Sequence, residues 1–317
     1  MTLFREIKIA GTGSFTPSKV VTSEELASRL GSDVDWIYSN LGIVERRICG
    51  EDEFSSDLAT EAAKNAIYSA GLSPNDIDLI IVATATPDRR APSTACIVQE
   101  KLGISNRCPA FDMNAVCSGF LYAMTIGFQL IESRAYKNVL VVGVDTFSKI
   151  TDWNRRDCVF FGDGAGAVVL QSAPGSSSYF SSKLFADGTG KDCFTVFPSD
   201  QFFTMDARAV YETGTSVLTQ AVQEILAENA LSVDDVSVVI PHQPSVRVLK
   251  RTSELLGIPF AKFKTNMERH ANTASATVPL LLDQVNKGSE IQSGDSVIFA
   301  AVGSGWTWGA AIYKWHQ

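Results

Sequence analysis

Cys117 is the residue whose type and position most directly suggest chemistry. A mostly apolar run over residues 108–113 predicts a buried strand, and the uncharged run over residues 116–131 predicts a helix that is buried on every side. Cys117 therefore lies at or near the N-terminus of this helix, where unpaired backbone N–H groups and the helix dipole favour negative charge. We expect the pKa of this thiol to be lowered, which makes a nucleophile, although a single cysteine often only packs in a core.

His242 is the second candidate. It directly follows a buried predicted strand, in the sequence Pro-His-Gln-Pro, and catalytic groups in such sheets collect at the carboxyl ends of strands. The chain has three histidines: His316 is terminal, and His270 lies two residues before Asn272, so one of that pair is expected to be structural. A lone histidine is more often a satisfied core residue, and the place at a strand end is what favours catalysis.

Two glycine-rich segments differ in the structure predicted around them. Residues 161–167 (Phe-Gly-Asp-Gly-Ala-Gly-Ala) precede the apolar residues 168–170, a predicted strand, whereas a dinucleotide site needs a helix there. We therefore interpret these glycines as positions of close backbone packing. Residues 303–309 (Gly-Ser-Gly-Trp-Thr-Trp-Gly) end a predicted strand, where backbone N–H groups can bind an oxyanion. Taken alone, that segment is a turn.

The elements that must position these residues form two similar halves. Residues 76–81 and 235–240 match almost position for position, and Pro-Ser opens a predicted helix after each of these strands. The helix predicted over residues 272–288 is the counterpart of the Cys117 helix. Further helices are predicted at 56–71, 92–102, 207–229 and 244–256, and further strands at 6–12, 138–144, 165–170, 296–302 and 309–315. This alternation predicts an α/β fold with parallel-rich sheets, in which the N-termini of corresponding helices face a common centre.

The division between the halves is expected in the Ser-, Gly- and Pro-rich residues 171–182. We place an N-terminal half, which carries the nucleophilic cysteine, at residues 1–172. A C-terminal half, which carries the histidine and the asparagine, comes next at residues 173–317.

Composition excludes several classes of protein. The chain has 317 residues, 45% of them hydrophobic and 20% charged, as in ordinary soluble proteins. A net charge of −8 argues against a nucleic-acid-binding protein, which needs an excess of Lys and Arg. Six scattered cysteines without a CxxC pair predict reduced thiols and no metal site. The run at 116–131 is too short and too polar for a membrane span, and the first residues lack the apolar core of a signal peptide. We therefore expect a cytoplasmic enzyme with no membrane partner.

A basic face is predicted on the helix at residues 244–256. Arg247, Lys250 and Arg251 share one side of this helix, and its apolar residues fall broadly opposite. On an acidic chain, such a face beside His242 can receive an acidic partner. A solvated surface explains the pattern about as well.

Together, these residues resemble the β-ketoacyl-acyl carrier protein synthase III family, the initiating condensing enzymes of bacterial fatty acid synthesis in the thiolase-like superfamily. The resemblance extends from Gly11-Thr-Gly-Ser to Thr307-Trp-Gly309. It is most specific at Cys117 in Ala-Val-Cys-Ser-Gly-Phe, His242 in Pro-His-Gln and Asn272 in Arg-His-Ala-Asn-Thr. It implies a layered α/β/α/β/α fold built from two similar halves, and a homodimer.

The resemblance also implies the reaction. Cys117 accepts an acyl group from a coenzyme A thioester. Malonyl-acyl carrier protein then loses carbon dioxide, and His242 and Asn272 hold the enolate while its carbon attacks the acyl group. The backbone N–H groups of Cys117 and Ser304 hold the tetrahedral oxyanion. Acyl-CoA and the malonyl-carrier protein are substrates, so no cofactor is implied.

Further contacts are implied by the same resemblance. Trp36 and Arg155 match a pair that sandwiches the coenzyme A adenine, and Arg247 matches a basic residue that receives the carrier protein, which favours the basic face as a docking surface. The full set of expected coenzyme A and acyl contacts is Trp36, Arg155, Phe161, Ala91 and Arg208.

The chain departs from the family pattern at several positions, namely Asn40 for an Arg, Pro244 and Ser245 for the Ala and Asn of His-Gln-Ala-Asn, Arg208 for a pantetheine-contacting Asn, and Ala91 for a Phe. That Phe reaches across the dimer and closes the acyl pocket. Its absence predicts primers longer than acetyl, unless Phe128, Phe161 or Phe203 fills the space.

Three other functions stay open. A specialised relative that primes a secondary metabolite would keep the same catalytic residues. A cysteine-dependent thioesterase would use the same nucleophile with water, but Asn272 argues against it because hydrolysis has no enolate to stabilise. A degenerate partner subunit would be expected to have lost Cys117, His242 or Asn272, and all three are present.

Overall fold

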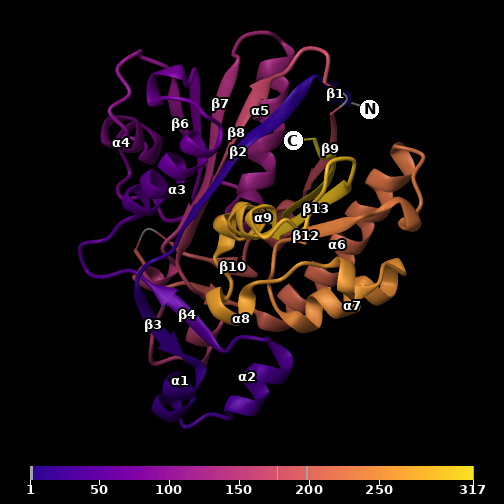
Figure 1. Ribbon diagram of the computed structural model, residues 1–317. Helices are drawn as coiled ribbons and strands as arrows, with labels where there is room; N and C mark the ends of the chain where they lie inside the picture. Colours follow the sequence, from indigo (N-terminus) through magenta and orange to yellow (C-terminus); the bar gives the residue numbers. More distant parts are fainter. Residues whose placement is uncertain (1–2, 177, 198, 317) are drawn as a thin grey trace.

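The computed structural model describes residues 3–176, 178–197 and 199–316 as two five-stranded sheets between layers of helices (Figure 1). Helices α5 (Gly119–Glu132) and α9 (Thr277–Lys287) lie between the sheets and pack with side chains of both. The outer faces are covered by α3 (Ser55–Ser69) and α4 (Thr94–Lys101) on one sheet, and by α6 (Ala207–Glu228) and α7 (Val246–Leu256) on the other. This is the expected α/β/α/β/α layering. Among the described residues, no helix is both long and apolar enough to span a bilayer.

The two sheets have the same strand order. The first runs β2 (Ile7–Phe15), β8 (Gly164–Ser172), β7 (Asn138–Asp145), β5 (Leu79–Ala83) and β6 (Ala110–Met113). Apart from its edge strand β1 (Leu3–Arg5), the second runs β9 (Tyr179–Ala186), β14 (Thr307–Lys314), β13 (Ser296–Gly303) and β12 (Val238–Pro241). A parallel bridge between Val239 and Phe263 takes the place of β6. In both sheets the first two pairs are antiparallel and the others parallel, so the halves are built alike, as the sequence repeat predicts.

One short strand crosses between the halves. β1 (Leu3–Arg5) pairs with β9 at the edge of the second sheet, although it precedes β2 of the first. The N–H of Ile9 in β2 also donates to the hydroxyl of Tyr313 in β14 (3.0 Å). The segment expected to join the halves, residues 171–182, includes the end of β8, at residue 172, and the start of β9, at residue 179. The exact division at residues 172 and 173 stays a prediction.

Close packing between β8 and α9 explains the glycines of residues 161–167. A Cβ on Gly166 would lie 2.3 Å from the backbone nitrogen of Leu280, closer than a side chain tolerates. β8 continues as a strand beyond these glycines, so the helix required for a dinucleotide site is not formed there. The interpretation of this segment as a packing motif is confirmed.

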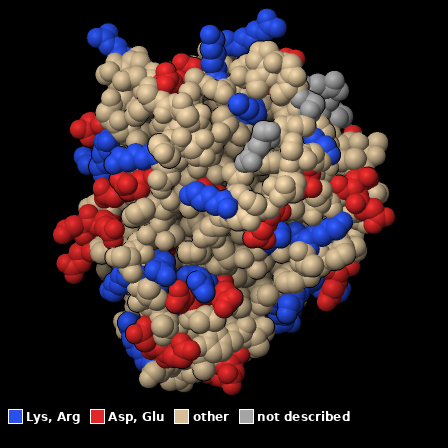
Figure 2. Space-filling view, in the orientation of Figure 1, with Lys and Arg blue, Asp and Glu red and all other residues tan. Residues whose placement is uncertain are grey.

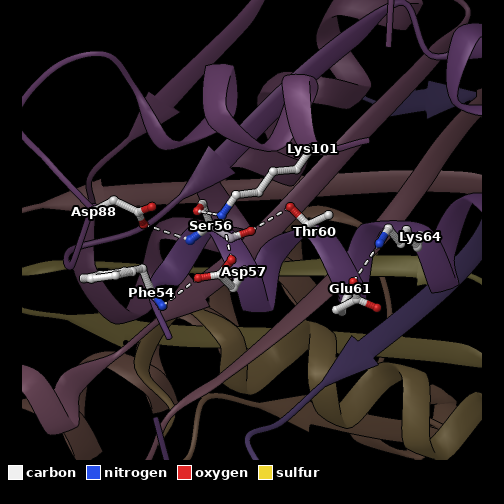
Figure 3. A network of polar contacts seen from close by, with 8 residues as sticks. All are labelled: Phe54, Ser56, Asp57, Thr60, Glu61, Lys64, Asp88 and Lys101. Carbon is white, nitrogen blue, oxygen red and sulfur yellow. Dashed lines mark hydrogen bonds and ion pairs between the residues drawn. The ribbon is translucent and has the colours of Figure 1, made fainter. Parts of the chain in front are cut away.

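A polar network holds the N-terminus of α3 (Figure 3). The carboxylate of Asp57 accepts the N–H of Phe54 (2.9 Å) and a bond from Lys101 of α4 (2.6 Å), and Asp88 accepts the N–H of Ser56 (2.8 Å). Carboxylates at a helix start satisfy N–H groups that lack a partner within the helix. The network therefore joins α3 to α4 and to the loop between β5 and α4.

A small module at the bottom of Figure 1 consists of β3 (Lys19–Thr22), α1 (Ser23–Leu30), α2 (Val34–Asn40) and β4 (Glu45–Ile48). It carries Trp36. The N–H of Val246 at the start of α7 donates to the carbonyl of Leu41 (2.9 Å), and a Cβ on Gly42 would meet Val246 at 2.9 Å. The module that carries Trp36 thus contacts the helix that carries the predicted basic face.

Candidate active site

Cys117 lies in a tight turn between β6 and α5, which we call the Cys117 turn (residues 114–118). A 3-10 helix covers Val116–Ser118, and α5 begins at the next residue. Val116 has a positive φ of 46°, which is rare for a β-branched residue. Its N–H donates to Oδ1 of Asn114 (3.1 Å), which holds the turn in this conformation. The strand-to-helix junction predicted for Cys117 is confirmed.

The Cys117 turn packs against the end of β13. A Cβ on Gly303 would lie 3.0 Å from the backbone nitrogens of both Cys117 and Ser118, so a side chain at this position would displace the turn. The hydroxyl of Ser118 donates to Thr307 Oγ1 in β14 (2.8 Å). The backbone at Cys117 is therefore held beside Gly303 and Ser304, the segment expected to share the oxyanion.

A single cleft, with a cavity volume of about 170 Å³, brings together the residues expected to react. Cys117, His242 and Asn272 all line it, although they lie far apart in the sequence. It is also lined by four other residues of the expected site, Trp36, Phe161, Arg247 and Ser304. Within the described residues, its wall does not include Ala91, Arg155, Arg208, Lys250 or Arg251.

His242 comes directly after β12 and is only 2% exposed. Its backbone N–H donates to the carbonyl of Ala300 in β13 (2.7 Å), which fixes the residue at the strand end. Burial lowers the pKa of His242 to about 3, and a backbone hydrogen bond with Ala274 opposes this shift. The ring is therefore neutral near pH 7 and carries a single N–H group.

Asn272 opens a second tight turn, residues 272–276, which we call the Ser275 turn. Two backbone hydrogen bonds fix Asn272. Its N–H donates to the carbonyl of Phe160, and its carbonyl accepts the N–H of Gly162 (both 3.1 Å). Its side-chain Oδ1 accepts the N–H of Ala274 (2.9 Å). Because Oδ1 is committed to the turn, the amide offers its Nδ2 hydrogens to a ligand. His270 instead contacts Gln284 on α9 (3.0 Å), in keeping with a structural role.

The predicted lowering of the Cys117 pKa is wrong. Burial raises the pKa of the thiol, the Asp145 carboxylate raises it further, and the residue's own backbone N–H opposes both. Sequence reasoning weighed the N–H groups at the start of α5 but not the apolar surroundings or the buried carboxylate. The thiol therefore keeps its proton near pH 7 and becomes a nucleophile only as that proton leaves.

An aromatic cluster lies beside Cys117. Phe147, Phe161 and Phe203 pack together with ring centroids 4.7 to 6.4 Å apart, and the Cys117 side chain packs against them. Phe128, another ring expected near the acyl group, lies instead in the core between the sheets. Phe161 and Phe203 are therefore the two rings of the expected three that stand near the thiol.

Trp36 and Arg155 line one surface hollow next to the cleft. The guanidinium over the Trp36 ring is that of Arg156, 4.4 Å from the ring centroid, whereas Arg155 forms an ion pair with Asp157 (2.5 Å). A sandwich of adenine between Trp36 and Arg155 stays a prediction. Arg156 is a further candidate that sequence reasoning missed.

Two expected contacts lie away from the cleft. Arg208 at the start of α6 is exposed and forms an ion pair with Glu212 (2.8 Å). Ala91 is exposed in the loop between β5 and α4, which Asp88 fastens to α3 (Figure 3). Neither residue reaches Cys117 within this chain, and their roles in substrate binding stay predictions.

The basic residues of α7 are exposed beside the cleft. Arg247 lies over the Tyr211 ring (4.6 Å to its centroid) at the cleft wall, and Arg251 pairs with Glu254 (2.9 Å). Lys and Arg side chains on this face of the molecule alternate with Asp and Glu (Figure 2). Arg247 is therefore the basic residue best placed to meet a ligand that enters the cleft.

The departure at Ser245 has a local explanation. Its hydroxyl accepts the N–H of Val248 (3.2 Å) and caps α7. Ser and Asn are both favoured at this position of a helix, so the start of α7 is preserved despite the change.

Sequence reasoning missed Asp145 and Ser275. Ser275 occupies the place in its turn that Cys117 has in the other, and its hydroxyl donates to the buried carboxylate of Asp145 (2.6 Å). The available signal was a repeated pattern, Asn-Ala-Val-Cys at residues 114–117 and Asn-Thr-Ala-Ser at residues 272–275. Apolar periodicity does not reveal it, because the pattern specifies a turn.

Sequence models of one family match both halves of the chain. The model described as 3-Oxoacyl-[acyl-carrier-protein (ACP)] synthase III matches residues 111–188, and that of its C-terminal part matches residues 226–315. Beta-ketoacyl-[acyl-carrier-protein] synthase III of Erythrobacter litoralis (strain HTCC2594) is 44% identical, covering 97% of this chain and 98% of the relative. The protein of the same name from Neisseria meningitidis serogroup A is 41% identical, covering 97% and 99%.

Solved structures show the same likeness. The 3-oxoacyl-[acyl-carrier-protein] synthase III of Aquifex aeolicus VF5 superposes with a TM-score of 0.94 at 37% identity, covering 98% of this chain and all of that one. The priming β-ketosynthase of the R1128 polyketide biosynthetic pathway gives 0.91 at 28% identity, covering 98% and 96%. The similarity in fold thus extends over nearly the whole chain.

Proposed function

The chain belongs to the 3-oxoacyl-[acyl-carrier-protein] synthase III family, and from this membership we propose that it condenses an acyl group held on Cys117 with malonyl-acyl carrier protein. It is an acyltransferase that forms 3-oxoacyl-carrier protein, the initiating step of fatty acid synthesis. One observation supports this proposal most directly. A thiol and two side-chain donors line the same cleft, namely Cys117, His242 and Asn272.

The first half-reaction loads the thiol. The sulfur of Cys117 attacks the carbonyl of an acyl-CoA thioester, the bond to coenzyme A breaks, and the thiol proton leaves with coenzyme A. During the attack the carbonyl oxygen becomes an oxyanion. The close packing of Gly303 on the Cys117 turn supports a role for the N–H groups of Cys117 and Ser304 in binding it.

The second half-reaction joins the two substrates. The malonyl group loses carbon dioxide, and the electron pair of the broken bond moves onto the thioester to give an enolate. The neutral ring of His242 and the Nδ2 of Asn272 are the donors for its oxygen. The enolate carbon then attacks the acyl carbonyl, and the sulfur of Cys117 leaves and regains a proton. No cofactor takes part in either half-reaction.

The substrate contacts fit the same scheme. Coenzyme A is bound at Trp36 and Arg155, with Arg208 near the pantetheine. The acyl chain lies against Phe161, with Ala91 supplied by the second chain of a homodimer. The acidic carrier protein docks on the exposed basic residues of α7, Arg247, Lys250 and Arg251. The enzyme works in the cytoplasm, with its catalytic halves divided at residues 172 and 173.

A priming role in secondary metabolism is the second candidate. It is favoured by the likeness to the R1128 priming ketosynthase over nearly the whole of both chains. The same cleft and the same half-reactions would serve it, with a different primer or carrier protein. Comparing carrier proteins as malonyl donors distinguishes the two roles.

Acyl loading is the direct test. The protein is incubated with acetyl-CoA and longer acyl-CoA thioesters, and intact and peptide mass spectrometry locates the added mass, which should be on Cys117. Cys193→Ala, a half-buried cysteine outside the cleft, is the control and should load like the parent. Malonyl-carrier protein should then remove the acyl mass and yield 3-oxoacyl-carrier protein. Label on another cysteine, or none with every thioester, refutes the assignment.

A further inference from the structure

Asp145, the last residue of β7, forms hydrogen bonds with the Ser275 turn. The N–H and the hydroxyl of Ser275 both donate to Oδ2 of Asp145 (2.9 and 2.6 Å). The other oxygen, Oδ1, accepts the N–H groups of Ala85 and Thr86 (2.8 and 3.1 Å) and the hydroxyl of Thr86 (2.9 Å). Burial raises the pKa of this carboxyl, and the hydrogen bonds from Ser275, Ala85 and Thr86 oppose the shift. Asp145 therefore joins two strand ends to the turn.

The Ser275 turn connects to Asn272, one of the two proposed enolate donors. The N–H of Ala274, next to Ser275, fixes the amide of Asn272 through its Oδ1. A displacement of Ser275 would therefore move Ala274 and change the direction in which the Asn272 amide donates.

We propose that Asp145 is a positioning residue for decarboxylation, which sets the direction of the Asn272 amide by holding the Ser275 turn. It does not line the cleft, so it acts through the turn and not on the substrate. Catalytic donors lose about 100-fold in rate when they are misplaced by about 1 Å. The inference rests on the proposed condensation, because only that reaction needs the enolate donors.

The same carboxylate also makes the Cys117 thiol harder to ionise. Its negative charge is one of the causes that raise the pKa of Cys117, after burial. Removing the charge should therefore make the thiol easier to ionise while the decarboxylation slows. General damage to the fold would lower both the rate of decarboxylation and the reactivity of the Cys117 thiol. A slower decarboxylation together with a thiol that ionises more easily therefore identifies a positioning role.

Asp145→Asn is the first variant. The amide can keep its oxygen toward Ala85 and Thr86, but it then presents an N–H group to the N–H of Ser275, where two donors cannot pair. We expect the release of carbon dioxide from malonyl-carrier protein to slow about 10- to 100-fold, the scale of a misplaced donor. Alkylation of Cys117 by iodoacetamide at pH 7, monitored by peptide mass spectrometry, should proceed at the parent rate or faster.

Two further variants complete the test. Ser275→Ala removes the hydroxyl but keeps the N–H bond to Asp145, so decarboxylation should slow less than in Asp145→Asn while alkylation stays unchanged. Asp283→Asn is the matched control: Asp283 is a buried carboxylate on α9 that accepts the hydroxyls of Thr12 (2.8 Å) and Ser14 (2.6 Å) outside the cleft wall. Its decarboxylation rate should stay near that of the parent.

The outcomes separate the positioning role from the proposed function. A parent that neither loads Cys117 nor decarboxylates malonyl-carrier protein refutes the proposed function itself. An active parent whose Asp145→Asn variant decarboxylates at the same rate overturns the positioning role, as does an equal loss of decarboxylation and alkylation in a folded variant. If Asp145→Asn does not fold, Ser275→Ala decides: a slower decarboxylation with unchanged alkylation supports the proposal, and a parent-like rate overturns it.

Discussion

The Cys117 turn and the Ser275 turn share a backbone but not their surroundings. In each, an asparagine Oδ1 accepts the N–H of a residue with positive φ, and a helix of the central layer comes next. The Cys117 turn packs against Gly303, which has no side chain that could bind it. The Ser275 turn faces Asp145, at the equivalent end of β7, and its N–H and hydroxyl are both bound by the carboxylate.

A second difference lies on the neighbouring strand. When residues 76–83 are aligned with residues 235–242, Ala83 stands where the other half has His242. The carbonyl oxygen of Ala83 lies 3.0 Å from the hydroxyl oxygen of Ser275, so this strand end also contacts the Ser275 turn. The duplicated fold thus supplies two similar turns, and the residues at the adjoining strand ends differ. Of the two equivalent residues Cys117 and Ser275, Cys117 lines the cleft and Ser275 binds Asp145.

Exchanging the side chains of the two turns should give the largest effect. Cys117→Ala should reduce acyl loading and condensation at least about 1,000-fold, because the covalent intermediate needs this sulfur. Ser275→Cys in the otherwise unchanged chain should not be acylated, because its thiol would face Asp145. Peptide mass spectrometry after incubation with acetyl-CoA reads both positions. Acyl mass at position 275 would show that an acyl-CoA thioester can reach this position.

Substitutions of Asn272 and Asn114 should have different effects on decarboxylation, although the two residues hold similar turns. Asn272→Asp keeps the acceptor for the Ala274 N–H but removes the Nδ2 donor, so decarboxylation should lose about 2–4 kcal/mol, as should His242→Ala. Asn114→Asp is the matched control, since it keeps the bond to Val116, and should stay close to the parent rate. The release of carbon dioxide from malonyl-carrier protein measures all three. Parent-like decarboxylation by Asn272→Asp or His242→Ala would contradict the assigned roles.

The basic face of α7 should affect only one half-reaction. Replacing Arg247 and Arg251 by Glu should raise the KM for malonyl-carrier protein about tenfold, because charge complementarity is reversed. Loading of Cys117 by acyl-CoA should be unchanged. Added salt should weaken the parent's interaction, since exposed charges are screened beyond about 10 Å at 0.1 M. An equal loss in both half-reactions would point to misfolding.

Only substitutions near Cys117, and none near Ser275, should change the length of acyl chain that the enzyme accepts. Phe203→Ala enlarges the space beside the thiol, so longer acyl-CoA thioesters should gain about 0.8 kcal/mol, roughly fourfold, per buried methylene. Ala91→Phe should shorten the range if a second chain completes the pocket. A loading series from acetyl-CoA to dodecanoyl-CoA compares both variants with the parent, which should accept primers longer than acetyl. A parent restricted to acetyl, or unchanged profiles in both variants, would rule this out.

His242 should give the smallest effect, through pH. The unfolded chain binds a proton at this residue near pH 6.5, whereas the folded chain does so only near pH 3. Above pH 6.5 both states are neutral, and below it the unfolded state gains protons first, so stability falls as the pH drops. Between pH 7.5 and 5.5 this residue should lower the free energy of unfolding by about 1.4 kcal/mol. Urea unfolding should show a smaller pH dependence for His242→Gln, and an equal one would place the ring in solvent.

Apolar patterns in the sequence predict much of the fold. The strand expected at residues 76–83 and the helix expected at residues 207–229 are present as β5 and α6. β9 is not predicted, because Tyr179–Ala186 mixes Ser and Lys with aromatic residues beside a Ser- and Gly-rich segment. Burial of that strand depends on its partners β1 and β14, which local sequence does not contain.

The proposed site was predictable where a side chain carries the proposed chemistry itself. The cleft brings together Cys117, His242 and Asn272 as expected. Asp145 and Ser275 escape such reasoning, because their roles come from burial and from hydrogen bonds between distant segments. The wrong pKa direction for Cys117 has the same origin, since a buried carboxylate and an apolar wall outweigh the local effect of a helix terminus.

The crossing strand β1 has a consequence for synthesis on the ribosome. β1 is translated before the whole first sheet and its partner β9 only after it, and the Tyr313 hydroxyl that binds Ile9 follows much later. Pairings between such distant segments form slowly and leave edges exposed until they close. β1 therefore stays unpaired on the nascent chain until β9 is made, and the bond that joins Ile9 to the second sheet forms only after β14 is translated.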